Sequence, residues 1–274
     1  MTVTCDRGTG NRSQVTCTQG NRSQVSTELI EATKVKPLGG KSYGSIPHLP
    51  GSRLGPGDHH CHQGQADICT VKPRDRHDWI IVQEKLDGTN VGVARIDGAI
   101  IPLTRAGYVA DTSPHAQHHY FHRWVMLHQS RFKEVLSEGE RLCGEWMLQA
   151  HGSQYDLEHE PFYVFDLFSG NRRVPYNEFI RRLGGIFMTP QVLQMGQHSL
   201  TTDDAMAILG TNGFHGCLER PEGAVWRVER DGVVDFLAKF VRPDKVDGKY
   251  LTTEEGSPRT VWNFGVDRFM ESLR

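Results

Sequence analysis

One lysine, Lys85, ends an apolar, strand-like run at residues 79–82 and lies within Glu84-Lys85-Leu86-Asp87-Gly88-Thr89-Asn90. A strand delivers such a side chain to a fixed place, and Gly88 lets the backbone turn tightly or approach a ligand closely. A lysine held in this way can act as a nucleophile. Lys-x-Asp-Gly is also a common turn sequence with a solvated lysine, so the interpretation depends on what else the chain contains.

Five further motifs follow Lys85, each on or beside a strand-like run. In order and spacing they resemble the motifs of the covalent nucleotidyltransferases, which include polynucleotide ligases and capping enzymes. Five ordered motifs are much harder to produce by chance than one. They are Thr104-Arg105-Ala106-Gly107, Gly144-Glu145-Trp146, Phe162-Tyr163-Val164-Phe165-Asp166, Glu222-Gly223-Ala224-Val225 and Ala238-Lys239, and a further short match lies at Tyr43-Gly44-Ser45-Ile46-Pro47-His48.

Within that superfamily the chain resembles the ATP-dependent RNA ligases of the RNA ligase 2-like family, over about residues 41–242. The discriminating motif is Glu-Lys-x-x-Gly-Thr-Asn. The resemblance implies that ATP and a divalent metal ion, Mg²⁺ or Mn²⁺, are used to join RNA ends that carry a 3′-hydroxyl and a 5′-phosphate. AMP would be held covalently as lysyl-AMP on the way.

The resemblance also implies a role for each matched residue. Lys85 attacks the α-phosphate of ATP, and Lys239 holds that phosphate. Glu222 is the carboxylate associated with the metal, which suits the oxygen ligands that Mg²⁺ prefers. The remaining matches are Glu145 for the ribose hydroxyl, Phe165 for stacking on adenine, Arg105 for the nucleotide or the RNA 3′ end, Asn90 near the acceptor end, Glu84 near adenine, and Asp87, which agrees with the wider superfamily.

A nucleophilic lysine must be neutral, although the free side chain has a pKa near 10.4. We therefore expect the site to lower the pKa of Lys85 by burial, by nearby cations such as Lys239 and Arg105, or by a hydrated metal ion. For Glu145 and Phe165 a plain structural interpretation remains open, as a solvated strand glutamate and a core phenylalanine.

The elements that must position these residues alternate between strands and helices from residue 79 onward. Asp97-Gly98 and Asp231-Gly232 each indicate a hairpin, because Asp-Gly suits the type I′ turn. The expected class is α+β, a nucleotidyltransferase (adenylation) domain of twisted, mainly antiparallel sheets with flanking helices. We expect strands at 90–96, 99–105, 141–148, 162–168, 223–230 and 233–241, and helices at 176–183, at 202–209 and from Ser113-Pro114 onward.

Two groups of histidines invite a metal-binding interpretation. Asp58-His59-His60-Cys61-His62 has adjacent ligands that converge poorly on one tetrahedral ion, so a polar surface loop is favoured. In the helix after Ser113, solvated histidines are favoured over a metal site, because no carboxylate supports them. They are His115, His118, His119, His122 and His128, and the apolar face of the same helix, which we expect in the core, comprises Phe121, Trp124, Val125, Phe132, Val135 and Leu136.

Composition limits the class of protein. With 274 residues, 37% hydrophobic and 23% charged, the chain can form one substantial core, and it contains no apolar run long enough for a membrane span. Six sparse cysteines are expected to be reduced thiols, and no signal peptide is evident, so the expected compartment is the cytoplasm. A formal charge of −2 means that RNA contact must come from a local basic patch.

The expected organisation is a disordered tail at 1–38, followed by an adenylyltransferase domain at 39–274. The tail contains a ten-residue polar repeat, and the stretch 39–62 is expected to be an ordered loop or a linker. Only 35 residues follow Lys239, which leaves no room for a full carboxy-terminal OB or helical domain. The usual second lysine of the Lys239 motif is replaced by Leu237, so Arg242 is a candidate substitute.

Three activities therefore remain in view. The first is an ATP-dependent RNA ligase acting in RNA repair. The second is an adenylyltransferase that seals poorly alone and needs a partner such as an end-healing kinase or phosphatase. The third is a catalytically silent module that binds RNA ends, which the joint presence of Lys85, Glu145, Glu222 and Lys239 disfavours. DNA ligation and use of NAD are less favoured, because the Gly-Thr-Asn motif is typical of RNA ligases.

Overall fold

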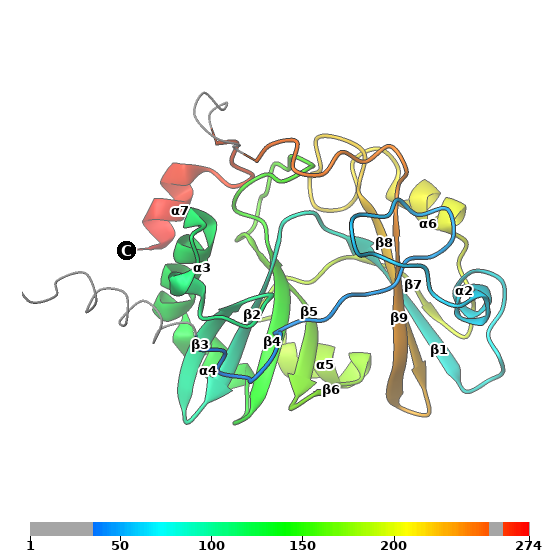
Figure 1. The fold of residues 1–274 in the computed structure, drawn as a ribbon, viewed down its shortest axis with the longest axis horizontal. Coiled ribbons are helices and arrows are strands. Elements are labelled where there is room, and N and C mark those ends of the chain that lie inside the picture. Colours follow the sequence, from blue (N-terminus) through cyan, green and yellow to red (C-terminus); the bar gives the residue numbers. More distant parts are fainter. Residues whose placement is uncertain (1–34, 252–259, 274) are drawn as a thin grey trace, which may run out of the picture. The chain divides into compact units, whose positions relative to one another are not determined.

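The strands form two antiparallel sheets, which Figure 1 shows with their helices. The computed structural model describes residues 35–251 and 260–273. The four-stranded sheet has the order β7 (Val192–Gly196), β1 (Asp78–Lys85), β8 (Gly223–Arg230), β9 (Val233–Val241). The five-stranded sheet has the order β3 (Ala99–Thr104), β2 (Thr89–Ile96), β4 (Glu140–Trp146), β5 (Phe162–Ser169), β6 (Arg172–Arg173).

Both expected hairpins have the backbone that Asp-Gly favours. In the turn between β2 and β3, Asp97 and Gly98 have φ values of 50° and 75°, and Asp231 and Gly232 between β8 and β9 have the same values. Positive φ at both central residues defines the type I′ turn, whose twist matches that of the flanking strands. The β8–β9 hairpin brings Lys239 next to the strand that begins after Glu222.

Helices cover the outer parts of both sheets (Figure 1). Helices α3 (Ala116–Leu127) and α4 (Gln129–Val135) contact β3, α2 (Gln63–Thr70) contacts β9, and α6 (Thr202–Leu209) contacts β7 and β8. The side chain of Thr201 accepts the N–H of Asp204 at 3.0 Å and thereby caps α6. The remaining elements are the short 3₁₀ turn η1 (Ala110–Thr112) and the helices α5 (Tyr176–Leu183) and α7 (Val266–Ser272).

The core has two large parts, and β1 contributes to both. Ile81 packs with the core of the five-stranded sheet, which includes Trp124, Trp146 and Phe162. Ile80 and Val82, which face the other way, pack with Trp226 and the helices beside the four-stranded sheet. Because side chains alternate along a strand, a strand buried on both faces reads as a continuous apolar run, as residues 80–82 do.

A buried ion pair connects the two sheets. Arg227 on β8 donates to Asp166 on β5 at 2.9 Å and to Glu229 at 2.7 Å, and its side chain is 2% exposed. Asp166 also accepts from Arg173 at 2.7 Å and from the hydroxyl of Tyr43 at 3.2 Å. A carboxylate buried to this degree needs several donors to offset the loss of water. The contact therefore fixes one sheet relative to the other.

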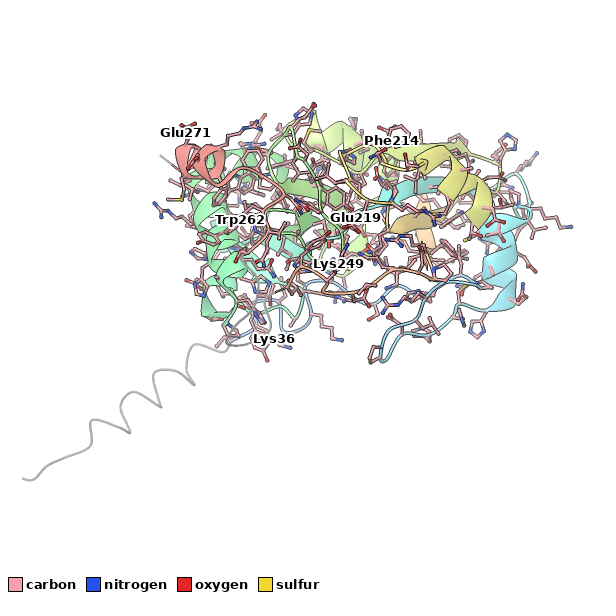
Figure 2. All side chains as sticks on the ribbon, turned by 90° about the horizontal axis from the view of Figure 1, so that it is seen from above. Lys36, Phe214, Glu219, Lys249, Trp262 and Glu271 are labelled. Atoms are coloured by element: carbon pink, nitrogen blue, oxygen red, sulfur yellow. The ribbon has the colours of Figure 1, made fainter. Side chains whose placement is uncertain are left out.

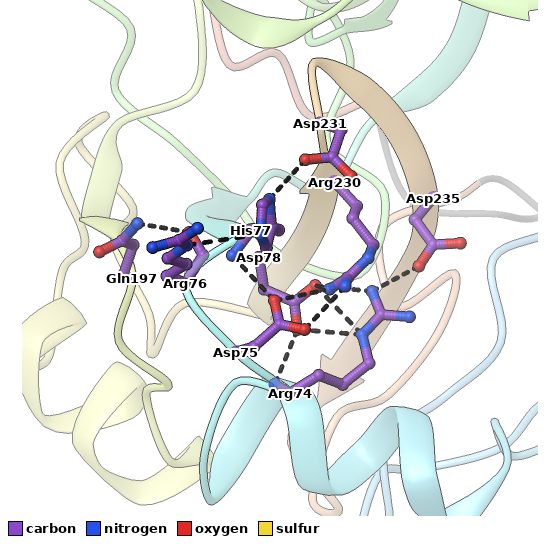
Figure 3. A network of polar contacts seen from close by, with 9 residues as sticks. All are labelled: Arg74, Asp75, Arg76, His77, Asp78, Gln197, Arg230, Asp231 and Asp235. Carbon is purple, nitrogen blue, oxygen red and sulfur yellow. Dashed lines mark hydrogen bonds and ion pairs between the residues drawn. The ribbon is translucent and has the colours of Figure 1, made fainter.

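A second polar network holds the outer end of the four-stranded sheet (Figure 3). The carboxylate of Asp78, whose side chain is fully buried, accepts from the guanidinium of Arg74 at 2.7 Å and from that of Arg230 at 3.0 Å. Arg74 also pairs with Asp235 on β9. These contacts join the start of β1 to both strands of the neighbouring hairpin, so the network stabilises the sheet at the end away from Lys85.

Most of the expected elements are confirmed, including the α+β class and the antiparallel sheets. Helices α5 and α6 have the expected bounds. The apolar face after Ser113 is buried as expected, but it belongs to two helices that meet at His128. His118 corrects the expectation of solvated histidines, since it is 8% exposed and its ring contacts the hydroxyl of Ser113 at 2.6 Å. The polar repeat lies outside the described residues.

We predict that Arg227→Met lowers the free energy of unfolding by about 3–5 kcal/mol, because it leaves Asp166 and Glu229 buried with one cation fewer. Arg53→Met is the matched control. Its partner Asp247 is 62% exposed, so its loss should stay below about 1 kcal/mol. Denaturant unfolding monitored by tryptophan fluorescence measures both values. Equal losses in the two variants would contradict the role given to Arg227.

Candidate active site

Lys85 lies at the carboxyl end of β1, where the central strand of the sheet ends. Its Nζ donates to Oε2 of Glu222 at 2.6 Å, and its side chain is 22% exposed. The strand register explains the meeting, because Lys85 is paired opposite Gly223, the residue after Glu222. A Cβ on Gly223 would lie 1.8 Å from the carbonyl oxygen of Phe240, so only glycine fits this position in the hairpin. The sequence motifs of Lys85 and Glu222 therefore form one site.

Two more carboxylates surround this pair. Glu145 on β4 accepts the N–H of Gly88 at 3.1 Å, and Asp87 accepts the N–H of Gly152 at 3.0 Å. Burial disfavours the charged form of Glu145 and raises its pKa to about 7. The pKa of Glu222 is also raised by burial, against the attraction of Lys85. The arrangement concentrates negative charge around one lysine.

The pKa of Lys85 differs from the expectation. Burial opposes its charged form, but the charges of Glu222 and Glu145 outweigh that effect, so the pKa is raised above its ordinary value. The expectation that Lys239 and Arg105 lower the pKa of Lys85 is therefore wrong for this arrangement of side chains. An opposite charge within a few ångströms favours the ionised form more strongly than a distant like charge disfavours it. Deprotonation of Lys85 near neutral pH would require that its carboxylate partners be neutralised or engaged elsewhere.

Lys239 on β9 approaches this group from the far side of β8. Its pKa is lowered by burial and by the charge of Lys85. Its Nζ lies 3.8 Å from Oδ1 of Asp58. Its backbone N–H donates to the carbonyl of Pro47, and its carbonyl accepts the N–H of Leu49. The ordered-loop interpretation of residues 39–62 holds here, because the segment covers the edge strand β9.

His48 links that loop to the sheet. Its Nδ1 lies 2.6 Å from the hydroxyl of Ser52, and its Nε2 lies 3.1 Å from Asp58. Ser52 in turn accepts the N–H of Val241 at 2.9 Å. If Ser52 donates to Nδ1, the proton of the neutral ring lies on Nε2, the nitrogen that faces Asp58. Asp58 thus belongs to a set of polar contacts that ties the loop to the sheet. Among the described residues no group of three or more His, Cys, Asp or Glu lies together as metal ligands would.

Phe165 is placed by an irregularity in the sheet. In the β4–β5 ladder Cys143 pairs with Asp166 and Gly144 pairs with Val164, so Phe165 is the extra residue of a bulge. Bulges re-aim side chains and are common beside active sites. The ring is half-buried and meets Tyr43 edge to face at 5.1 Å, which leaves part of it exposed.

Arg105 and Asn90 lie at the same edge of the five-stranded sheet as Glu145. Asn90 pairs directly opposite Glu145 in the β2–β4 ladder, and its Oδ1 is buried without a hydrogen-bond partner among the described residues. Arg105 follows β3 and is exposed, with weak contacts to Ser45 at 3.3 Å and to the carbonyl of Gly44 at 3.5 Å. Both side chains keep donors or acceptors free for a ligand.

Glu84 is not brought to the Lys85 group, because neighbours in a strand point to opposite faces. Its Oε2 accepts the N–H of Phe214 at 3.1 Å and lies 3.9 Å from His215. Its Oε1 is buried without a partner in the described part of the chain, and burial raises its pKa to about 7. Glu84 therefore lies beside Phe214 and His215, on the other face of β1 from Lys85.

The sequence interpretation missed three residues near Lys85. Lys245 forms a short ion pair with Asp87 and lies 3.1 Å from Ser153 Oγ. His151 contacts the hydroxyl of Thr89 at 2.8 Å. Lys245, Ser153 and His151 lie outside the recognised motifs. The only sign of them in the sequence was that Lys245 is a lysine in a polar turn. Arg242, the expected substitute for a lysine at Leu237, instead pairs with Asp244 and donates to the carbonyl of Pro221.

A lysine held between buried carboxylates at the end of a strand, inside paired antiparallel sheets, defines a site suited to covalent transfer chemistry. The sequence profile of the family described as RNA ligase matches residues 78–241. The chain belongs to the RNA ligase family. No curated protein matches the sequence.

Solved structures show limited similarity. An RNA ligase of Naegleria gruberi with PPi is 21% identical over 61% of this chain and 50% of that one, with a TM-score of 0.45. An archaeal ATP-dependent RNA ligase, form 2, is 18% identical over 73% of this chain and 48% of that one, also with a TM-score of 0.45. The match spans about half the length of these two ligases.

We predict that His48 contributes to acid sensitivity. Burial and the charge of Lys239 lower its pKa to about 4, against an opposing effect of Asp58. The unfolded chain, with an ordinary histidine pKa near 6.5, binds the proton more readily, so stability falls as the pH drops from 6.5 towards 4. In His48→Gln the free energy of unfolding should fall less over this window, by on the order of 3 kcal/mol.

Urea unfolding at several pH values measures the slope. His60→Gln is the control, because His60 is an exposed histidine of the same loop. His118 and His215 also have pKa values of about 4, so a residual slope is expected in every variant. An unchanged slope in His48→Gln would contradict the assignment.

Proposed function

We propose that this protein is an ATP-dependent RNA ligase that joins 3′-hydroxyl and 5′-phosphate RNA ends through lysyl-AMP on Lys85. The observation that carries the proposal is the 2.6 Å contact between Lys85 and Glu222, made within the stretch that matches the RNA ligase family. We assign the adenylyltransferase domain to residues 39–274. The arrangement of a strand-end lysine, buried carboxylates and a second lysine supports this activity.

In the first step the neutral Nζ of Lys85 attacks the α-phosphorus of ATP. An N–P bond forms, the P–O bond to the β-phosphate breaks, pyrophosphate leaves and the nitrogen loses its proton. An oxygen of the RNA 5′-phosphate then attacks the AMP phosphorus, the N–P bond breaks, and Lys85 leaves as an amine that takes up a proton. Finally the 3′-hydroxyl oxygen attacks the phosphorus of the RNA 5′-phosphate and loses its proton, the P–O bond to AMP breaks, and AMP leaves. Each step needs positioning and charge neutralisation more than acid–base chemistry.

The other side chains fit these steps. Glu145 is suited to accept a hydrogen bond from a ribose hydroxyl. The part of the Phe165 ring that the bulge leaves exposed is suited to stack on adenine. Lys239 can hold the α-phosphate. Arg105 and Asn90 retain free polar groups for the nucleotide or the acceptor end. Glu84 lies on the face of β1 opposite Lys85, so we propose no contact with adenine for it.

A hard divalent cation fits the donor set. Glu222 offers a carboxylate oxygen, and Mg²⁺ in such sites is held by one or two carboxylates together with substrate phosphates. When bound, the ion supplies positive charge to the polyphosphate. Glu222 would hold Mg²⁺ or Mn²⁺, and release of Glu222 from Lys85 would remove the strongest influence that keeps the lysine protonated.

We further propose RNA repair in the cytoplasm as the setting. The four cysteines of the described residues are free thiols, which suits a reducing compartment. None of the described helices is long and apolar enough to cross a membrane. The 5′-phosphate and 3′-hydroxyl ends would come from a kinase or phosphatase that heals broken RNA.

We predict that label from α-³²P-ATP stays on the denatured wild-type protein and is lost from Lys85→Arg. Arginine keeps the charge but is never neutral at working pH, so it cannot attack phosphorus. Lys72→Arg is the control, because Lys72 is exposed and outside the site. Gel electrophoresis of the labelled protein reports the adduct. A full-strength adduct in a folded Lys85→Arg variant would exclude Lys85 as the nucleophile.

We also predict that RNA with a pre-adenylylated 5′ end is sealed only to a 3′-hydroxyl, and faster when the acceptor ends in ribose. One hydrogen bond to the 2′-hydroxyl corresponds to roughly a tenfold rate difference. Added salt should slow sealing, because phosphate contacts are screened. Equal rates on all-DNA ends would contradict the RNA assignment. An adduct without sealing would favour the partner-dependent enzyme, and RNA binding without an adduct would favour the silent module.

A further inference from the structure

Lys245 is the one buried residue in an otherwise exposed turn. Residues 243–249 follow β9, and apart from Lys245 they are exposed or half-exposed. The side chain of Lys245 is 1% exposed. Removing an ammonium group from water is costly, so a lysine is rarely buried unless it is paired. The position of Lys245 therefore calls for a specific partner.

That partner is Asp87, two residues after Lys85. The Nζ of Lys245 forms a short ion pair with Oδ2 of Asp87 and lies 3.1 Å from the hydroxyl of Ser153. The same Oδ2 accepts the N–H of Gly152 at 3.0 Å. The turn after Lys85, the loop at 152–153 and the segment after β9 thus meet at one carboxylate oxygen.

Close packing fixes this meeting point. A Cβ added to Gly152 would lie 2.4 Å from the carbonyl oxygen of Val246 and 2.5 Å from Nζ of Lys245. The segment is also tied further along, because Tyr250 donates its N–H to the carbonyl of His151 at 2.7 Å. Lys249 pairs with Glu219 at 2.8 Å, and both are labelled in Figure 2. Lys245 is therefore held in place by its own segment.

The ion pair between Lys245 and Asp87 affects the position of Lys85, because Lys85 is surrounded by carboxylates. Asp87, Glu145 and Glu222 all act on Lys85, and two of these carboxylates have a lysine partner. Lys245 forms the ion pair with Asp87, so that Lys85 forms its ion pair with Glu222. Without the ammonium of Lys245, the largely enclosed carboxylate of Asp87, which is 13% exposed, would lose its ion-pair partner, and its charge already acts on Lys85. The Nζ of Lys85 would then be drawn towards the turn and away from Glu222.

We propose that Lys245 is a positioning residue of the active site, which holds Asp87 so that Lys85 stays aligned on Glu222. The inference rests on the proposed function for its effect on rate, while the contact itself stands on geometry. Lys245 lies beyond residue 241, where the family match ends, so the segment after β9 becomes part of the site.

The experiment measures lysyl-AMP formation in single turnover as a function of ATP concentration. Lys245→Met should lower the maximal rate by roughly tenfold to a hundredfold, the scale of a small misplacement of reacting atoms. The ATP concentration at half-maximal rate should stay within about twofold, because Lys245 acts through Asp87 and not on ATP. Lys245→Arg should recover part of the rate, because it keeps the charge.

Two controls separate positioning from general damage. Lys249→Met removes a lysine of the same segment that is 46% exposed, and it should keep the wild-type rate. In an Asp87→Asn background, which removes the charge that Lys245 offsets, Lys245→Met should cost at most about twofold more. Coupled residues show such non-additive effects, whereas independent ones multiply. The double variant leaves neither charge unpaired, so it also tests the idea if Lys245→Met alone folds poorly.

Thermal unfolding of the four members of this cycle tests the contact without activity. The melting temperature of the double variant should fall by less than the sum of the two single losses. Additive losses, a wild-type rate in Lys245→Met, or a raised half-maximal ATP concentration at full rate would each overturn the inference. Absence of any adduct in the wild type would contradict the proposed function instead, and the melting cycle would still decide whether Lys245 and Asp87 are coupled.

Discussion

The pairing of Arg227 with Asp166 is the constraint on which the site depends, because it fixes the two sheets relative to each other. The four-stranded sheet carries Lys85 and Lys239, and the five-stranded sheet carries Glu145 and the bulged Phe165. The covalent transfer chemistry that we propose needs such groups held to within a fraction of an ångström. A buried guanidinium with three acceptors provides that rigidity, since any shift of one sheet would leave charged groups unpaired in the core.

Local pattern was sufficient for the elements that carry the motifs. The apolar run before Lys85, the two Asp-Gly turns and the amphipathic stretch before Gly184 each contain their own stop signal, and the structure forms strands, hairpins and a helix there. Helix α2 and strand β7 were missed. Strand β7 pairs with β1 across more than a hundred residues, so its edge position depends on long-range contacts that periodicity does not report.

The same limit applies to the site. The resemblance grouped Lys85 with Glu222 and Glu145, and the structure brings these three together. It did not separate Glu84 from them, although strand alternation alone predicts that neighbouring residues face opposite ways. The contacts of Asp58 and Lys245 could not be predicted, because each residue reaches its partner from a polar turn that any surface loop could match. The pKa of Lys85 was misjudged for a related reason, since the number of nearby carboxylates is a property of the fold.

The replacement of a lysine by Leu237 has a physical reason in this fold. Leu237 pairs directly with Arg227 in the β8–β9 ladder and is buried. Residues directly opposite in a ladder share a face, and like charges there repel. A lysine at 237 would therefore place a second cation beside the guanidinium that links the sheets. A second lysine near Lys85 is instead provided by Lys245, from the turn after β9. The charge of Lys245 is offset there by Asp87. Strand β9 and the turn that follows it therefore serve both purposes. Leu237 on β9 keeps a second cation away from Arg227, and Lys245 in the turn pairs with Asp87 beside Lys85.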